Sequence, residues 1–278
     1  YQASMANCIC SYNQSRTAHQ QLLWVTTALV FLLFLHPTWA AEDENSSGEK
    51  PGLPAPQRFA ARAQRSYEEA KKRLDAAPTN PDAAWQLARA CFDLAEYATN
   101  NTQRAQIARE GIAVSRQLIN GHPSLAPASY YLGLNLGQLA RTQSIAALNT
   151  VEEMELALKR ALELDASFDY AGPDRSLGLL YLQAPGWPIS IGDRRKARRH
   201  LQQAVKRSPD YPENRLCLME AYLKWNDISA ASDQMRALEE LHPRARNQLA
   251  GDQWEPEWAD WNNRLELARK RLKPDDAK

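Results

Sequence analysis

The chain has 278 residues, a formal net charge of +1, 44% hydrophobic residues and 24% charged residues. These values are ordinary for a globular protein, and a chain this close to neutrality gives no sign of nucleic-acid binding.

An apolar run near the N-terminus has the pattern of a secretory signal. Residues 22–35, LLWVTTALVFLLFL, follow Arg16, and Thr38 and Ala40 fit a small-x-small cleavage site. The alternative is an uncleaved membrane anchor, but the run is short against the about 20 residues that a spanning helix needs. We therefore expect a signal peptide over residues 1–40 and export to the periplasm or another extracytoplasmic compartment.

Cleavage after Ala40 would remove one of 34 basic residues, leaving 33 against 33 acidic residues. Such a neutral chain argues against electrostatic capture of DNA or of an acidic membrane face. Two of the four cysteines would remain, too few for a disulfide scaffold. The removed pair, Cys8 and Cys10, precedes the apolar run, so lipid anchoring through these residues is not expected. Residues 41–56 are polar and rich in Pro and Gly, which predicts a disordered linker.

The rest of the chain repeats itself. The stretch AAWQLARACFDLA at 83–95 aligns without a gap with ASYYLGLNLGQLA at 128–140. A third copy, RSLGLLYL, begins at Arg175, and a fourth, RLCLMEAYL, begins at Arg215. A segment that recurs along the chain at intervals such as that from 83 to 128 is typical of stacked helical units.

Each copy is followed by a segment with a second signature, in which small and large residues are spaced by 4, 3 and 5 positions. ARRHLQQAVKRSPD supplies Ala197, Leu201, Ala204 and Pro209, and ASDQMRALEELHP supplies Ala231, Met235, Leu238 and Pro243. Small residues let two helices approach closely, a large residue fills the groove between them, and proline ends the second helix. The pattern predicts pairs of antiparallel helices.

Together these signatures resemble the tetratricopeptide repeat (TPR) family over most of residues 57–243. The resemblance implies an all-α fold, a right-handed α-solenoid of TPR-like helix pairs over residues 57–250. The aromatic residue that the family has early in the first helix is replaced in later copies by Asp174 and Arg215.

Both ends of the repeat region fit a solenoid. FAARAQRSYEEAKKRL has the second-helix spacing without a first helix, which predicts an N-terminal half-repeat. EPEWADWNNRLELARKRL has its tryptophans and leucines on one helical face and charges on the other. We expect residues 251–278 to form a C-terminal capping helix and tail.

Three consecutive copies carry seven to nine extra residues between their two helices, in EYATNNTQRAQ, ARTQSIAALNTVEE and QAPGWPISIGDRR. Equivalent connections of a solenoid line up along one edge, so we hypothesise that these insertions form one wall there and bind a partner. In the third insertion, Pro185 and Pro188 disfavour helix and Asp193 can cap a helix that begins at Arg194. Trp187 either packs on the solenoid edge or stays exposed for a ligand.

The stretch FDYAGPDRSLG at 168–178 gathers charged residues where one repeat meets the next. The TPR resemblance implies that first helices line a concave groove, where Arg175 can meet a partner's carboxylate. The alternative is an internal pair of Arg175 with Asp169 or Asp174 that locks the joint.

No catalytic or metal-binding motif is present. Three histidines follow Ala40, without the spacing of a metal site, and the chain has no phosphate loop, dinucleotide fingerprint or G-x-S-x-G elbow. We expect a protein that is not an enzyme and has no cofactor and no metal.

A second resemblance covers about residues 168–225. The run GPDRSLGLLYLQAPGWPISIGDRRKARRHLQQAV is similar to the TatT-like T component of TRAP-type periplasmic transporters, which is itself TPR-like. That family associates with a solute-binding partner and is often lipid-anchored, whereas this chain has no lipobox cysteine.

The sequence thus predicts an exported, non-catalytic scaffold that binds a protein or peptide through its groove and its wall of insertions. The alternative is a solute-handling or partner-docking subunit of a TRAP-type transporter, favoured by a deep apolar pocket; self-assembly through the end of the solenoid is a third. We expect no nucleic-acid partner, and a membrane partner only through an uncleaved signal segment. The candidate binding residues are Tyr130, Tyr131, Asn135, Asp174, Arg175, Tyr181 and Trp187.

Overall fold

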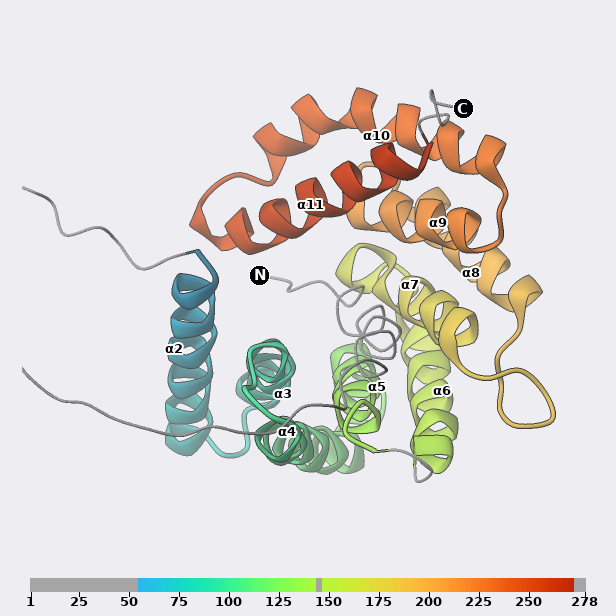
Figure 1. Ribbon diagram of the computed structural model, residues 1–278. Coiled ribbons are helices and arrows are strands. Elements are labelled where there is room, and N and C mark those ends of the chain that lie inside the picture. The colour runs from blue at the N-terminus through green and yellow to red at the C-terminus, as the bar shows by residue number, and fades with distance from the viewer. Residues whose placement is uncertain (1–54, 144–146, 273–278) are drawn as a thin grey trace, which may run out of the picture.

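A computed structural model describes residues 55–143 and 147–272, and the regular elements in that part of the chain are helices (Figure 1). They are α2 (Ala55–Ala76), α3 (Pro81–Glu96), α4 (Asn101–Gly121), α5 (Ala126–Ala140), α6 (Ala147–Leu164), α7 (Phe168–Gln183), α8 (Arg194–Arg207), α9 (Pro212–Lys224), α10 (Ile228–Gln248), a short 3-10 helix η1 (Asp252–Trp254) and α11 (Glu255–Leu272). The predicted signal peptide and most of the predicted linker lie outside the described residues. Within those residues, no helix is both long and apolar enough to cross a membrane.

The helices pack as four consecutive pairs. α3 packs with α4, α5 with α6, α7 with α8 and α9 with α10, and each pair packs on the next. Figure 1 shows the resulting arch, which runs from α2 at one end to α10 and α11 at the other. The predicted all-α solenoid of TPR-like helix pairs is confirmed.

Glycines that recur in the sequence repeat mark where paired helices touch. A Cβ atom added to Gly178 of α7 would lie 2.6 Å from Cγ of Leu201 in α8, and one added to Gly133 of α5 would lie 2.8 Å from Cγ of Leu158 in α6. Since Leu158 and Leu201 are fully buried, neither has free space to move into. The repeated small residue is therefore a requirement of helix packing.

Side-chain caps set several helix starts. The Asn80 side chain accepts hydrogen bonds from the backbone N–H groups of Asp82 and Ala83 at the start of α3. The Asp193 carboxylate accepts from the N–H groups of Arg195 and Lys196 at 2.7 and 3.0 Å. The prediction that Asp193 caps the helix starting at Arg194 is confirmed.

Two of the three predicted insertions contribute extra turns to the start of a second helix. α4 begins at Asn101, seven residues before Ala108, and α6 begins at Ala147, seven residues before Met154. The added helical turns contain no Pro or Gly, which favours helix there. The third insertion, Ala184–Asp193 with its two prolines, is an irregular loop.

Neighbouring connections do approach one another at the ends of the first helices. Glu96 at the end of α3 accepts a hydrogen bond from the Gln138 amide at 2.7 Å and pairs with Arg141 at 3.1 Å. Lys224 at the end of α9 donates to the Leu182 carbonyl near the end of α7 at 2.9 Å. The binding role of this edge stays a prediction.

The expectation that Pro243 ends its helix is wrong, because α10 continues to Gln248. Leu241, Ala245 and Leu249 are all buried on either side of the proline. Burial of this apolar stripe offsets the one backbone hydrogen bond that proline cannot donate.

The two ends of the arch meet. The Arg62 guanidinium of α2 donates to the backbone carbonyl of Asp252, just before α11 and 190 residues away in the chain. In Figure 1 the upper end of α2 lies beside the start of α11. The concave side of the solenoid is consequently bordered by both ends of the chain's repeat region.

Candidate partner-binding face

The concave side carries a band of aromatic and charged residues, which we call the inner face: Trp85, Arg89, Asp93, Tyr131, Asp169, Tyr170, Trp254 and Glu257. The Trp85 and Tyr131 rings stack with centroids 6.0 Å apart, which links α3 to α5. The Tyr170 ring lies 6.3 Å from the Trp254 ring, which links the start of α7 to η1, just before α11. The inner face therefore brings together residues from five separate elements, of which Tyr131 and Glu257 are buried.

The charges of the inner face influence one another. Arg89 pairs with Asp93 one helical turn later at 3.6 Å. Burial works to lower the pKa of Arg89, but the nearby Tyr131, Asp93, Asp169 and Glu257 raise it overall. Burial raises the pKa of Asp93 to about 6, although Arg89 opposes that shift. The face thus combines a fixed cation with carboxylates on both sides of the arch.

A cavity opens beside this band, between α2 and α3. It has a volume of about 200 Å³, and its lining includes Arg73, Trp85, Gln86, Arg89 and Asp93. These five side chains supply an aromatic surface, two cations, an amide and a carboxylate, a combination suited to a polar peptide side chain.

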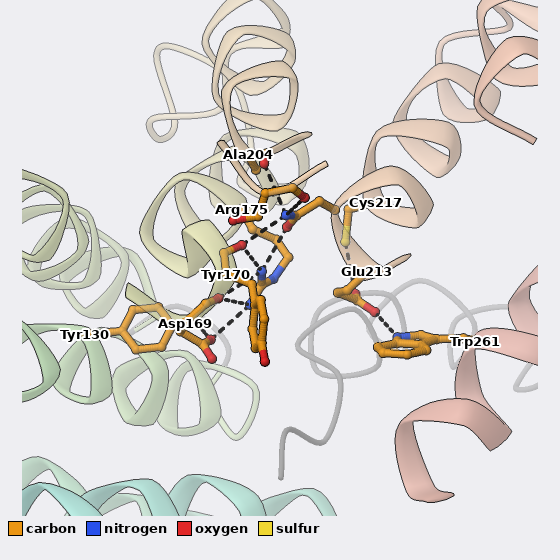
Figure 2. A network of polar contacts seen from close by, with 10 residues as sticks. Tyr130, Asp169, Tyr170, Arg175, Ala204, Glu213, Cys217 and Trp261 are labelled. Carbon is orange, nitrogen blue, oxygen red and sulfur yellow. Dashed lines mark hydrogen bonds and ion pairs between the residues drawn. The ribbon is translucent and has the colours of Figure 1, made fainter. Parts of the chain in front are cut away.

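Arg175 is the centre of a buried polar network at the start of α7 (Figure 2). Its guanidinium pairs with the Asp169 carboxylate at 3.0 Å and donates to Oδ1 of Asn214 at 2.9 Å. The Tyr130 hydroxyl donates to the same Asp169 carboxylate at 2.6 Å. The network joins α5, α7 and α9, so it fixes the relative positions of three successive first helices.

The same network holds an unusual backbone turn. Asp169, Tyr170 and Ala171 have φ values of 56°, 54° and 62°, all in the left-handed helical region. That conformation costs an L-residue about 1–2 kcal/mol. Arg175 donates to the Tyr170 carbonyl at 3.2 Å and, at 3.4 Å, to the Asp169 carbonyl, which stabilises the turn from within. Of the two roles considered for Arg175, the internal pair is what the structure shows; contact with a partner stays a prediction.

Burial and pairing act in opposite directions on Asp169. Burial raises the pKa of its carboxyl above the ordinary value, while Arg175 and the Tyr130 hydroxyl work to lower it. The carboxylate is retained in this buried position by the two hydrogen-bond donors that it satisfies.

The other acidic residue of this stretch, Asp174, faces α8. Its carboxylate lies 2.8 Å from Nδ1 of His200 and 2.9 Å from Nε of Arg207. Asp174 is 1% exposed, and its partners come from the second helix of its own pair. It therefore joins α7 to α8 and lies apart from the inner face.

A second buried cluster docks α11 on α9. Both oxygens of the Glu213 carboxylate accept hydrogen bonds from Arg264, at 3.0 and 2.9 Å, and one accepts from the Trp261 indole at 2.6 Å. Arg264 also pairs with Glu220 at 2.7 Å and with Asp260 at 3.0 Å. Burial works to raise the pKa of Glu213, but Arg264 and Arg175 outweigh it and hold that pKa below its ordinary value.

The remaining predicted residues are scattered. Tyr130 and Tyr131 are 1% and 3% exposed, with ring centroids 5.2 Å apart, and Asn135 ties α5 to α3 by donating to the Ala88 carbonyl at 2.9 Å. Tyr181 donates to the Glu155 carboxylate, away from this group. Trp187 is 89% exposed on its loop. The structure thus brings Tyr130, Tyr131 and Arg175 together and leaves Tyr181 and Trp187 apart.

Sequence reasoning missed Arg89, Asp93, Trp254 and Glu257. A signal for the first two was present, because Trp85, Arg89 and Asp93 are spaced by four residues and so share one face of a first helix. No comparable pattern marks Trp254 and Glu257, which reach the inner face only because the arch bends back on itself. Within residues 55–143 and 147–272, no group of three His, Cys, Asp or Glu side chains is placed to hold a metal ion.

Comparisons with known proteins agree with this architecture. The family model described as "Regulator of microtubule dynamics protein 1-3" matches residues 57–171, less than half of the chain. TTC0263, a thermophilic TPR protein from Thermus thermophilus, has a crystal structure that superposes with a TM-score of 0.56 at 21% identity, covering 77% of this chain and 97% of that one.

A second crystal structure, that of MamA, gives a TM-score of 0.45 at 17% identity over 70% of this chain and 99% of that chain. A search of curated proteins found no match. The superposition on the Thermus thermophilus protein and the four helix pairs described above show that this chain has the tetratricopeptide repeat fold.

Proposed function

We propose that this protein is a non-catalytic scaffold that binds a protein or peptide partner on its inner face. The observation that supports the proposal most strongly is the row of Trp85, Arg89 and Asp93 on α3, which lines a cavity. Aromatic and charged groups held by helices need little ordering when a partner binds, so more of the interaction energy appears as affinity.

The chain itself supplies an example of the recognition involved. α11 is a helix whose Trp261 and Arg264 dock on Glu213 and Glu220 of a first helix, through an indole hydrogen bond and charge-assisted pairs. Asp93 supplies a carboxylate of the same kind to the cavity beside the inner face. We infer that the partner presents a helix or short peptide with a cationic and an aromatic side chain.

Site-directed photo-crosslinking tests this proposal. A photoreactive amino acid at Gln86, in the cavity lining, is expected to crosslink a protein or peptide in the native host, and the same residue at Arg236, exposed on α10, is not. The additional substitution Asp93→Lys is expected to abolish the crosslink, because it reverses a carboxylate that the partner's cation meets.

Equal crosslinking from Gln86 and Arg236, or a crosslink that survives Asp93→Lys, would contradict binding on the inner face. Native mass spectrometry of the same purified chain distinguishes the scaffold from the alternative function. A retained small solute on a chain without a protein partner would favour the solute-handling subunit of a TRAP-type transporter.

Export is a separate part of the proposal and rests on the apolar run at residues 22–35. The intact mass of the protein from its native host tests it. A chain that begins at Ala41 supports export through a cleaved signal, and a chain that retains the run supports the membrane-anchor alternative.

A further inference from the structure

The loop Ala184–Asp193, which we call the Trp187 loop, exposes its apolar residues. Trp187 is 89% exposed and Ile189 is 65% exposed, and both lie at the tip between Gly186 and Gly192. Figure 1 shows this connection between α7 and α8 projecting away from the body of the molecule. An apolar indole with this much exposure is unfavourable in water, which indicates that Trp187 contacts a partner.

The backbone of the loop is held in place although its tip is exposed. The Gly192 N–H donates to the Pro185 carbonyl at 2.9 Å, and the Asp193 N–H donates to the Tyr181 carbonyl at 3.0 Å. Ile191, two residues beyond Ile189, packs against the hydrophobic core. The alternation of inward Ile191 with outward Ile189 keeps the apolar tip directed away from the protein.

Positive charge is concentrated in α8, which follows the loop directly in the chain. α8 has seven Lys or Arg residues and no Asp or Glu in 14 residues, whereas the whole chain has a net charge of only +1. Arg195, Arg199 and Lys206 are exposed and lie on the side of α8 opposite its buried Ala197 and Leu201, and we call them the basic face.

These charges are not neutralised locally. Carboxylates do lie beside α8, but they meet other groups of that helix. Asp193 caps its start, Asp227 pairs with Arg198 at 3.5 Å, and Asp174 contacts His200 and Arg207 at 2.8 and 2.9 Å. Among the residues that the structure describes, none of Arg195, Arg199 and Lys206 has a carboxylate within ion-pair distance. A field of one sign is therefore available to an external anion.

The near-neutral net charge argued against capture by an acidic membrane face, but it averages out the local excess of positive charge in α8. We propose that the Trp187 loop and the basic face of α8 form a docking surface for an anionic lipid bilayer, with Trp187 and Ile189 entering the headgroup region. Tryptophan favours that region because its ring is apolar and its N–H is polar. Each Lys or Arg near an anionic leaflet contributes about 1 kcal/mol without needing a fixed partner geometry. A projecting tip with aliphatic Ile189 suits a soft bilayer better than a rigid nucleic-acid backbone.

A local probe separates this surface from any effect of the N-terminal apolar run. In the full chain with Cys8 and Cys10 replaced by Ser, Ile189→Cys carries an environment-sensitive fluorophore, and Leu267→Cys, half-exposed on α11, is the matched control. Cys91 and Cys217 are buried and stay unlabelled. Vesicles of phosphatidylcholine with about 30% phosphatidylserine are expected to blue-shift the label at 189 and leave the label at 267 unchanged.

Charge and apolar contributions are tested on the same readout. Arg195→Gln with Arg199→Gln is expected to weaken vesicle binding about 30-fold, and Trp187→Ala by about fivefold or more. Arg236→Gln with Lys270→Gln removes the same net charge elsewhere and is expected to leave binding unchanged.

An equal shift at positions 189 and 267, no shift at either, or equal weakening by the two charge variants would overturn the proposal. So would shielding of the label at 189 by a soluble protein or a DNA duplex under conditions where vesicles give no shift. The crosslinking test of the inner face changes no residue of the Trp187 loop or of the basic face. The two proposals are therefore tested independently.

Discussion

At the scale of single residues, buried arginines organise this protein. Arg175 and Arg264 each satisfy several oxygen acceptors from different helices, and neither depends on solvent. Removing one partner of such a buried pair is costly because the other charge stays in a medium of low dielectric constant. The carboxylates that face these arginines are accordingly among the most sensitive positions in the chain.

The substitution Glu213→Gln tests the sensitivity of such a carboxylate at the Arg264 cluster. We expect it to lower the free energy of unfolding at pH 7 by about 3 kcal/mol, because it removes a charge from a buried pair. Since the folded-state pKa of Glu213 lies below its unfolded value, the stabilisation is present above about pH 4.5 and is lost as the pH falls through the folded pKa. Urea unfolding followed by circular dichroism at several pH values measures both effects.

The matched control is Glu239→Gln, which breaks the Arg269 pair between side chains 48% and 47% exposed. It is expected to change the free energy of unfolding by less than about 1 kcal/mol. A difference between wild type and Glu213→Gln that does not shrink from pH 5 to pH 3 would contradict the assigned pKa direction.

At the scale of the elements, the two helices of each repeat are set by close approach at small residues. Gly133 and Gly178 occupy the same repeat position, and each faces a fully buried leucine of its partner helix. The repeated small residues mark the points where two helices touch, and this is why the sequence alone predicts the helix pairs.

Gly178→Ala is expected to destabilise the protein by about 1–3 kcal/mol, because its Cβ would overlap Leu201, including that residue's backbone N at 3.1 Å. Gly121→Ala is the control: nothing lies within 4 Å of its added Cβ, and we expect no loss and a gain of up to about 1 kcal/mol. Thermal unfolding of the two variants is sufficient to compare them. A Gly178→Ala variant as stable as Gly121→Ala would contradict the packing argument, because helix propensity favours alanine at both positions.

Element boundaries were harder to predict than element identity. The extra residues before Ala108 and Met154 were expected as part of an edge wall and are helical turns, since a pairwise alignment counts residues but not their conformation. Pro243 was expected to end a helix and does not, because tertiary burial of Leu241 and Ala245 overrides the local signal.

At the scale of the whole molecule, the solenoid is an arch whose ends touch. The contact between Arg62 and the Asp252 carbonyl joins positions 190 residues apart, and the inner face combines α3 with α11. A repeat pattern specifies neighbours only, so neither contact was predictable from it. The candidate residues on α5 and α7 were predictable because the repeat itself marks the first helices.

Local coupling along the arch leads to a prediction for Trp261→Ala. Trp261 is 1% exposed and packs on Tyr211 with ring centroids 5.6 Å apart, so we expect a loss of about 3–5 kcal/mol. In a repeat protein each unit contacts mainly its neighbours, so hydrogen exchange should accelerate most in α9 and α10 and least in α3 and α4. Leu267→Ala, at a half-exposed position of α11, should change neither the free energy of unfolding nor the hydrogen-exchange rates. Uniform acceleration over all helices would show global cooperativity instead.

The turn at Asp169, Tyr170 and Ala171 has a consequence for chirality. Its backbone angles are the mirror image of those that L-amino acids prefer, and the turn persists because Arg175 holds its carbonyl groups. At Ala171 a D-alanine would adopt the same backbone in its own favoured region. The backbone at Ala171 is therefore better matched to the opposite enantiomer than to the residue that occupies it.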